Sequence, residues 1–588
     1  MVICVPIHLK LETLPVKTNL SIVMVFIHVL LLCEQSLAAA PIIDHKSIFH
    51  PVVGERGMVA SQEKLASQVG LDILQRGGNA VDSAVAVGFA LAVTLPKAGN
   101  LGGGGFMMVH LAKTGETIAL DYREMAPSAA TETMFLDSKG DVDKHISRNS
   151  FRSAGVPGTV RGLVQALEKY GRLSLAEVIQ PAIDLAEQGF VLSHELAAEL
   201  ESRRTQLSRS EAGRKIFYKA DGSAYKAGER FIQQDLAWSL RQIAQKGEQA
   251  FYEGEIAEKI VRDSKRHKGL IDREDLKTYT VASRDAVRGF YRGYEVVSMP
   301  PPSSGGVHVL QMLKVLENFN LKKMGHNSAD YLHALTESMK YAYADRSEYL
   351  GDPDFTQVPI KALTSGAYGK RIAKQIDFAQ TRASDDIKPG SEQPFESHDT
   401  THFSVADEEG NVVSNTYTLN FSYGSGIVIE GTGILLNNEM DDFSSKPGVP
   451  NAFGLLGGEA NAIEPRKRPL SAMTPVIVLK DDKPYLVLGS PGGSKIITVV
   501  LQVILNVLDH DMNIAEASSV PRIHHQWYPD ILNIEKGVSP DTIHLLKNKG
   551  HKTRDTRVLG STQSIMLKAG KMYGSSDPRR PGAITLGY

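Results

Sequence analysis

Around residue 400 the chain changes abruptly from a polar stretch to a pair of predicted β-strands. Residues 383–397 are mostly polar and contain prolines and a glycine, a composition typical of an exposed linker. Residues 401–406 then have the pattern of a strand, 407–411 of a turn, and 412–419 of a returning strand. A threonine at a strand start, such as Thr400, is usually structural because β-branched side chains fit a pleated sheet. Thr400 therefore takes on a catalytic meaning only together with other motifs.

The first part of the chain predicts helices followed by a glycine-rich turn. Ser61 is placed to cap an amphipathic helix that ends at Gly77, and Asn79 opens an apolar helix that runs to Thr94. Residues 99–105 contain four consecutive glycines, but they lack the lysine of a P-loop and the spacing of a dinucleotide-binding fold. We therefore expect a tight turn into a strand over residues 106–110, and no phosphate site.

The N-terminus has the pattern of a secretory signal. Lys10 and Lys17 precede an apolar run over residues 20–33, and Ser36-Leu37-Ala38 follows as a cleavage site. The run is about 14 residues long, short of the ~20 that span a membrane. The sequence thus predicts a signal peptide over residues 1–38 and a periplasmic or secreted protein. An uncleaved signal anchor is the alternative; a lipoprotein signal is disfavoured because Leu32 stands where a small residue is normally needed.

The composition of the chain excludes several kinds of site and partner. The only cysteines, Cys4 and Cys33, lie in the predicted signal peptide, so the mature chain has no thiol for a nucleophile, a metal site or a disulfide. Lack of cysteine is compatible with an oxidising compartment. The 65 basic and 67 acidic residues give a net charge of −2, and no basic run stands out. This balance argues against nucleic acid as a partner and favours an enzyme acting on small molecules.

The residues around Thr400 resemble the processing site of the γ-glutamyltranspeptidase family, in the run Asp-Thr-Thr-His-Phe-Ser-Val-Ala-Asp that starts at Asp399. Other segments match family motifs in the same order and cover nearly the whole chain after the signal. Their joint occurrence makes coincidence implausible. The matching segments are 77–105, 120–124, 155–161, 437–443, 466–475, 489–494 and 576–582.

The resemblance implies an α+β fold, the four-layer αββα sandwich of the N-terminal nucleophile hydrolases. It also implies two chains produced from one precursor: a large subunit over residues 39–399 and a small catalytic subunit over residues 400–588. The small subunit is expected to supply central strands, so the two chains would interlock in one domain as a heterodimer.

The family mechanism assigns the nucleophile to Thr400. A hydroxyl is a weak nucleophile without an adjacent base, and autocatalytic cleavage of the Asp399–Thr400 bond would create an α-amine with a pKa of about 7.7–8.0 on the same residue. By the same resemblance, Thr418 steadies the hydroxyl. Backbone N–H groups of Gly492 and Gly493 are expected to stabilise the oxyanion near the start of an apolar helix over residues 496–508.

The resemblance also implies how the zwitterion of a γ-glutamyl group is bound. Arg123 is expected to hold the α-carboxylate with paired hydrogen bonds. Ser471 would add a hydroxyl, and the backbone of Gly493 also faces the substrate. Many relatives have a second serine where this chain has Ala472, of which the backbone N–H remains, so we expect weaker carboxylate binding and not a new substrate.

The α-ammonium is expected to be held by Asp442 together with Asn420 and Glu439. Residues 447–458 resemble a lid loop, which often carries a tyrosine where this chain has Phe453. Phenylalanine can cover the site but cannot donate the hydrogen bond of the hydroxyl.

The predicted reaction is cleavage of glutathione and other γ-glutamyl amides, with transfer of the γ-glutamyl group to water, amino acids or peptides. No cofactor is expected. His524 and His525 are adjacent, point in different directions and have no third ligand nearby, so we interpret them as structural and expect no metal. A cephalosporin acylase that cleaves a glutaryl amide is the nearest alternative, and a degenerate, unprocessed binding protein is the alternative from another class.

Overall fold

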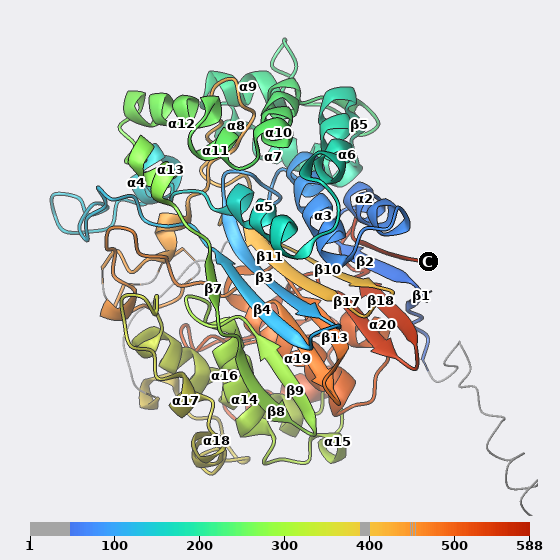
Figure 1. Ribbon diagram of the computed structural model, residues 1–588. Helices are drawn as coiled ribbons and strands as arrows, with labels where there is room; N and C mark the ends of the chain where they lie inside the picture. The colour runs from blue at the N-terminus through green and yellow to red at the C-terminus, as the bar shows by residue number, and fades with distance from the viewer. Residues whose placement is uncertain (1–46, 388–399, 447, 450, 453) are drawn as a thin grey trace, which may run out of the picture. The chain divides into compact units, whose positions relative to one another are not determined.

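The computed structural model describes residues 47–387, 400–446, 448, 449, 451, 452 and 454–588 (Figure 1). The predicted signal peptide, Asp399 and Phe453 lie outside the described residues. Residues 51–588 form one unit, to which the following description refers.

Two seven-stranded sheets form the centre of this unit, and neighbouring strands in both are antiparallel. The first sheet has the order β19 (Ile584–Gly587), β2 (Gly57–Ser61), β10 (Thr401–Asp407), β11 (Val412–Thr418), β3 (Gly104–Leu111), β4 (Glu116–Tyr122) and β7 (Ala282–Arg284). The second has the order β1 (Val52–Gly54), β18 (Lys571–Ser576), β17 (Gln563–Lys568), β13 (Lys483–Gly489), β12 (Val476–Lys480), β9 (Tyr294–Ser298) and β8 (Val287–Tyr291). Each sheet therefore combines strands from before and after residue 400.

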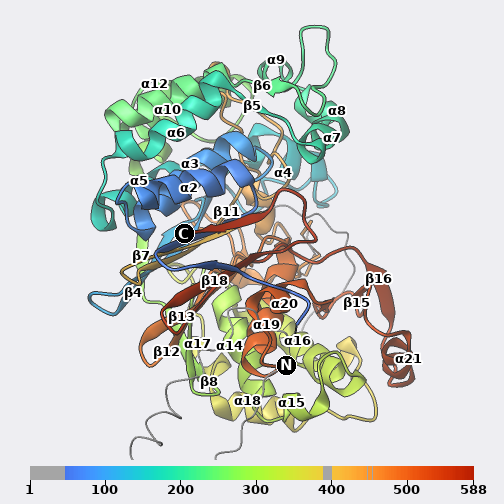
Figure 2. The same ribbon diagram turned by 90° about the vertical axis from the view of Figure 1, so that its right-hand side faces the viewer.

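Helices cover the outer face of each sheet, which gives the predicted αββα order of layers (Figure 2). Over the first sheet lie α2 (Lys64–Gln75), α3 (Ala80–Thr94) and α5 (Thr159–Tyr170), with α6 (Leu175–Gln188) and α10 (Gln234–Lys246) further out. On the side of the second sheet lie α14 (Gly305–Leu316), α16 (Ala329–Tyr349), α19 (Ile496–Leu508) and α20 (Ile514–Ser519).

Shorter elements fill the rest of the described chain. Two small sheets contain β14 (Ile523–His524), β15 (Leu532–Glu535) and β16 (Thr553–Thr556), and β5 (Phe190–Val191) and β6 (Arg230–Phe231). The remaining helices are α4 (Lys144–Asn149), α7 (His194–Ser202), α8 (Arg204–Leu207), α9 (Glu211–Phe217), α11 (Gln249–Tyr252), α12 (Glu255–Arg266), α13 (Arg273–Thr278), α15 (Leu321–Met324), α17 (Ile360–Leu363), α18 (Gly366–Ala373) and α21 (Pro540–Asn548). The 3-10 turns are η1 (Phe151–Ser153), η2 (Ser384–Asp386), η3 (Glu439–Asp442), η4 (Glu459–Asn461) and η5 (Gly493–Lys495). No helix in these ranges is long and apolar enough to cross a membrane.

The strand that begins after Thr400 is buried on both faces. Phe403 and Val405 of β10 pack in the core beneath α2 and α3, while Ala406 belongs to the core between the sheets. The intervening Ser404 donates its hydroxyl hydrogen bond to the carbonyl of Gln563 in the opposite sheet, at 2.9 Å. Because both faces are enclosed, β10 is fixed in register, and the residue at its start is fixed with it.

Most of the predicted elements are confirmed, with one error at a helix start. The apolar helix begins after Asn79, whose side chain forms a capping box with Asp82, and α19 has the predicted bounds. The cap of α2 was predicted at Ser61, but the residue is Glu63, whose carboxylate accepts the N–H of Ala66. Ser61 still belongs to β2, paired with β19, so the chain needs two more residues before it can turn into the helix.

Candidate active site

Thr400 lies at the start of β10 beside the end of β11. The register pairs Thr401 with Tyr417, which places Thr418 next to Thr400, and their hydroxyl oxygens are 3.4 Å apart. The Thr418 hydroxyl also accepts the N–H of Asn420 at 2.9 Å, so its position is fixed by the backbone. Thr418 is therefore close enough for the steadying role predicted for it.

Thr400, only 7% exposed, borders two cavities of very different size. A cleft of about 600 Å³ lies on one side and includes Gly492 in its wall. A cavity of about 20 Å³, room for about one water molecule, lies on the other. The small cavity brings together nearly all the residues singled out in the sequence: Arg123, Thr418, Asn420, Glu439, Asp442, Ser471, Ala472 and Gly493.

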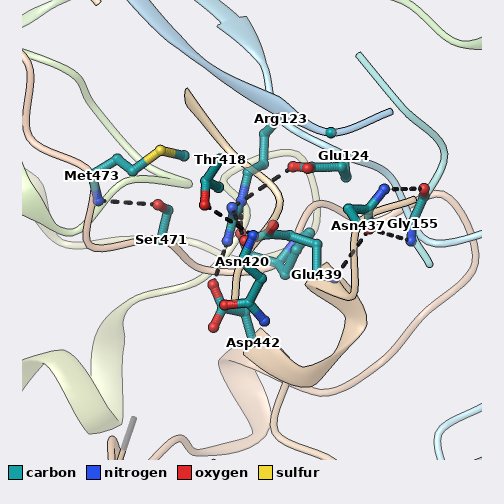
Figure 3. Close-up of polar contacts among 12 residues, drawn as sticks. Arg123, Glu124, Gly155, Thr418, Asn420, Asn437, Glu439, Asp442, Ser471 and Met473 are labelled. Carbon is teal, nitrogen blue, oxygen red and sulfur yellow. Dashed lines mark hydrogen bonds and ion pairs between the residues drawn. The ribbon is translucent and has the colours of Figure 1, made fainter. Parts of the chain in front are cut away.

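Arg123 is held by the two acids predicted to bind the substrate ammonium (Figure 3). It follows β4, and its Nη2 donates to Asp442 Oδ2 at 2.5 Å while Nη1 pairs with Glu439 Oε1. Its Nε donates to the carbonyl of Pro469 at 3.2 Å. The pocket is thus closed by internal ion pairs.

Burial and charge oppose each other in this cluster. Burial by itself lowers the pKa of Arg123, but Glu439, Asp442 and Glu124 outweigh it and raise that pKa above its usual range. Burial raises the pKa of Glu439 and of Asp442, although Arg123 opposes both shifts. The carboxylate of Glu124 lies 3.7 Å from Arg123 Nη1, and burial raises the pKa of Glu124 to about 7. Added negative charge is therefore costly here, and a bound ammonium would relieve it.

Asn437 positions the turn that carries both acids. Its Oδ1 accepts the N–H groups of Gly155 and Glu439 at 2.9 and 3.0 Å, and its Nδ2 donates to the carbonyl of Gly155 at 2.8 Å (Figure 3). The same Nδ2 also donates to the carbonyl of Gly102 at 2.8 Å. All three segments were singled out in the sequence. The sequence did not predict that the Asn437 side chain joins them, because the three segments lie far apart along the chain.

The predicted oxyanion turn has a backbone that requires glycine. Gly492 has φ of 141° and Gly493 has φ of 55°, both in the region that L side chains rarely adopt. The turn continues through η5 into α19, whose N-terminal end favours negative charge. Tyr343 of α16 donates its hydroxyl hydrogen bond to the carbonyl of Ser494, which fixes the turn from outside.

Ser471 is clamped by a neighbouring loop. Its N–H donates to the carbonyl of Pro302 at 2.8 Å, and its carbonyl accepts both the N–H and the hydroxyl of Ser304, at 2.8 and 2.7 Å. The Ser471 hydroxyl accepts the N–H of Met473 at 3.1 Å (Figure 3). Ala472 follows with only a methyl group, so Ser471 carries the one side-chain hydroxyl of this pair.

The adjacent histidines are part of the core. His524 hydrogen bonds to the hydroxyl of Thr498 at 2.9 Å, and His525 to the carboxylate of Asp530 at 3.1 Å. Both rings are buried, and these contacts agree with the structural role predicted for them.

One group of described residues, His333, Glu337 and His551, has ligand atoms within 4.8 Å of one another. His333 and His551 are hydrogen bonded to each other at 2.8 Å. Lys340 Nζ lies 3.2 Å from Glu337 and supplies the positive charge that this carboxylate faces. The group is therefore satisfied as an internal network of hydrogen bonds and an ion pair.

A four-layer αββα sandwich with a threonine at the start of a central strand, beside a glycine turn, defines the class of N-terminal nucleophile hydrolases. A crystal structure of a cephalosporin acylase from Bacillus halodurans has this fold; it aligns with a TM-score of 0.82 and 27% identity and covers 93% of this chain and 98% of its own. The model of the γ-glutamyltranspeptidase family matches residues 66–587, so the chain belongs to this family.

Similarity to curated relatives places the chain in the same family. The glutathione hydrolase proenzyme of Escherichia coli (strain K12) is 54% identical over 545 residues, which cover 92% of this chain and 94% of the relative. The acylase ACY 1 proenzyme of Pseudomonas sp. (strain SE83) is 36% identical and covers 90% of this chain and 94% of its own length. The chain is thus more similar to the glutathione hydrolase than to the acylase.

Proposed function

We propose that the chain is an autoprocessed γ-glutamyltransferase and hydrolase. It cleaves glutathione and other γ-glutamyl amides through an ester on Thr400 and passes the group to water, amino acids or peptides. The observation that carries this proposal is the charged cavity beside Thr400, in which Arg123 faces Asp442 and Glu439. A cation opposite two acids is complementary to a substrate that carries a carboxylate and an ammonium.

The proposal includes processing at the Asp399–Thr400 bond. It would give a large chain over residues 39–399 and a small chain over residues 400–588, after removal of a signal peptide over residues 1–38 and export to the periplasm or the medium. The Escherichia coli relative is named a proenzyme, which supports processing. Strands β10 and β11 lie between β2 and β3, so the two products would share one sheet and remain together as a heterodimer.

In the processed enzyme the free α-amine of Thr400 takes the proton of its own hydroxyl, and the oxygen attacks the γ-carbonyl of the substrate. The N–H groups of Gly492 and Gly493 stabilise the resulting oxyanion, and Thr418 orients the hydroxyl. The amine returns the proton to the leaving amino group as the C–N bond breaks. Water or an acceptor amine then attacks the ester and releases the γ-glutamyl group.

Substrate binding has to open the ion pairs between Arg123 and the two acids. The α-carboxylate binds Arg123, Ser471 and the N–H of Ala472, while the α-ammonium takes Asp442 and Glu439, with Asn420 beside them. The substrate thereby supplies a new partner to each side of the pair that it separates. Phe453 would cover the bound group.

The alternative, a cephalosporin acylase, is favoured less by the site. A glutaryl group has the carboxylate but not the ammonium, so it would separate Arg123 from Asp442 and leave that acid unpaired. An unpaired buried charge is strongly destabilising. The lower identity to the acylase relative agrees with this order of preference.

Product analysis with glutathione, with and without glycylglycine, tests the proposal. We expect release of glutamate from glutathione, and formation of γ-glutamyl-glycylglycine when the acceptor is present. A denaturing gel should show two chains. A single band in purified, matured protein without activity on glutathione would favour an unprocessed binding protein and refute the proposal.

A further inference from the structure

The side chain of Gln526 connects the oxyanion turn to one wall of the small cavity. It is buried and follows two residues after the end of β14. Its Oε1 accepts the hydroxyl hydrogen of Ser494, a residue of η5 in the oxyanion turn, at 2.7 Å. Its Nε2 donates to the carbonyl of Gly454 at 3.3 Å. Gly454 precedes Leu455, and both Leu455 and Ser494 line the cavity.

The neighbours of this amide fix its orientation. The carbonyl oxygen of Gly454 can only accept, so the amide nitrogen of Gln526 must face it. The amide oxygen then accepts from Ser494 and, at 2.9 Å, from His524 Nε2, which therefore carries a proton. The other ring nitrogen of His524 accepts from the hydroxyl of Thr498 in α19 at 2.9 Å. The amide is thus held in place by the helix that follows the oxyanion turn.

The wall that contains Leu455 is suited to move when substrate binds. The small cavity has room for about one water molecule, so a γ-glutamyl group can enter only if part of the wall shifts. Residues 454–458 belong to no helix or strand. The N–H of Gly454 and the carbonyl of Leu455 both bond to the backbone of Asn451, at 3.0 and 3.1 Å, so this stretch is held partly by itself. Loop segments of this kind are the parts of a fold that close over substrates.

We propose that Gln526 is a positioning residue for the oxyanion turn, and that it transmits the position of Leu455 over the bound γ-glutamyl group to that turn. The inference rests on the proposed function and adds to it a residue that does not contact the substrate. The turn is held at Ser494 on two sides, since Tyr343 binds its carbonyl and Gln526 its hydroxyl. The first contact comes from a helix, while the second is shared with the movable wall. Closure of the wall therefore aligns the N–H groups that stabilise the oxyanion.

Gln526→Met tests this role, because methionine has a similar length but makes neither hydrogen bond. The oxyanion donors would be displaced and not removed. Removal of one such donor costs about 10²–10³ in kcat, so we expect kcat for γ-glutamyl anilide to fall by about tenfold. KM should stay within about twofold of wild type, because Gln526 is not among the residues that line the cavity.

Two inhibitors separate positioning from a structural role. In the boronic acid analogue of glutamate, boron replaces the γ-carbon; it accepts the lone pair of the Thr400 oxygen, and the α-amine takes the hydroxyl proton. The tetrahedral adduct places an oxygen in the oxyanion position, whereas glutamate binds without forming it. In Gln526→Met, affinity for the boronic acid should fall by about the same factor as kcat, while affinity for glutamate should stay within about twofold of wild type.

Gln502→Met is the matched control, since Gln502 is another buried glutamine close by. Its Nε2 donates to the carbonyls of Thr498 and Ile523 at 2.7 and 2.8 Å, and its Oε1 accepts the N–H of Ile523 at 2.9 Å. These partners lie outside the oxyanion turn, so the control should lower Tm but leave kcat and both affinities within about twofold of wild type. Ser494→Ala covers the case in which Gln526→Met does not mature. It removes one of the two contacts and should show a smaller loss with the same pattern.

A double-mutant cycle tests the connection to the wall. Leu455→Ala shortens a side chain that lines the cavity and should raise KM and lower kcat. If Gln526 transmits the position of the wall, Leu455→Ala should lower kcat less in the Gln526→Met background than in wild type. Independent, additive effects on kcat would overturn the coupling.

Equal losses of affinity for glutamate and for the boronic acid in Gln526→Met, or a kcat no lower than that of Gln502→Met, would also overturn the inference. The proposed function is tested separately by wild type. If wild type cleaves glutaryl anilide but not γ-glutamyl anilide, the function is wrong. The comparison of Gln526→Met with Gln502→Met on glutaryl anilide still decides the role of Gln526, because cleavage of either amide forms an oxyanion.

Discussion

Asp442→Asn is the change that most directly tests specificity for a γ-glutamyl group. The carboxylate of Asp442 lies at the wall of the small cavity, 2.5 Å from Arg123 Nη2, on the turn that Asn437 holds in place. Asparagine keeps the shape of the side chain and removes its charge. The substrate ammonium would then lose a partner of opposite charge in a buried site, with Glu439 left to receive it.

The size of the effect follows from the burial of this contact. A hydrogen bond to a charged group contributes about 1.5–3 kcal/mol, and about 1.4 kcal/mol corresponds to a factor of ten. We therefore expect kcat/KM for γ-glutamyl anilide to fall by roughly tenfold to a hundredfold. Glutaryl anilide should be unharmed or cleaved faster, because it has no ammonium and one acid fewer competes for Arg123.

The assay compares kcat/KM for both anilides on wild type and variant, after a gel has shown two chains in each. Asp441→Asn is the matched control. Asp441 is buried, but its carboxylate pairs with Arg148 at 3.0 Å and accepts the N–H of Ala452 at 3.2 Å. Its replacement should change both substrates alike. An equal loss on both substrates in Asp442→Asn would mean that Asp442 only supports the fold, and the argument for specificity would fail.

Four further outcomes follow from the same geometry. Thr400→Ala should remain one inactive chain, whereas wild type should split without added protease into pieces of about 360 and 190 residues; cleavage of the variant at the same bond would point to an external protease. Thr418→Val, which removes a hydroxyl 3.4 Å from that of Thr400, should lower kcat by about tenfold with little change in KM, and a change in KM alone would contradict an orienting role. The native pKa of Glu124 is raised from 4.5 to about 7, so the native state binds more protons than the unfolded state between these values, and the free energy of unfolding falls as pH rises through them. Glu124→Gln should show a smaller fall in Tm between about pH 5 and about pH 8 than wild type, and an identical fall in both would refute the assignment. Sequencing of the mature large chain should begin near Ala39; a start at Met1 on membrane-bound protein would refute export with signal removal.

Local patterns were enough to predict the elements that carry the nucleophile and the oxyanion turn. The alternation after residue 400 gives β10 and β11, and the apolar run over residues 496–508 gives α19, because each depends on neighbours close in sequence. The predicted start of α2 was wrong, although the hydrophobic pattern that predicts this helix is equally local. Pairing of Ser61 with β19, more than 500 residues away, decided where that helix begins.

Contacts between segments far apart in the chain could not be predicted either, because no local sequence pattern indicates them. The family resemblance identified Arg123, Glu439 and Asp442 as residues of the site, but not that they pair with one another. Arg346 of α16, which lines the small cavity beside Thr400, has no local signal at all. It lies in a helix that is buried along most of its length, where its neighbours show no amphipathic pattern to separate a cavity-lining residue from a core residue.

The ion pairs that Arg123 forms with Glu439 and Asp442 are complementary to a zwitterion, the substrate that we propose. On this proposal the substrate carboxylate would replace the acids at Arg123, and its ammonium would replace Arg123 at the acids. The number of buried opposite charges in contact would then be kept as the pocket opens. A group with one charge completes only half of this exchange and leaves either Arg123 or Asp442 without a partner. The site would thus discriminate against a substrate with one charge, because that substrate leaves a buried protein charge without a partner. A buried polar site rejects an incomplete substrate most strongly under this condition.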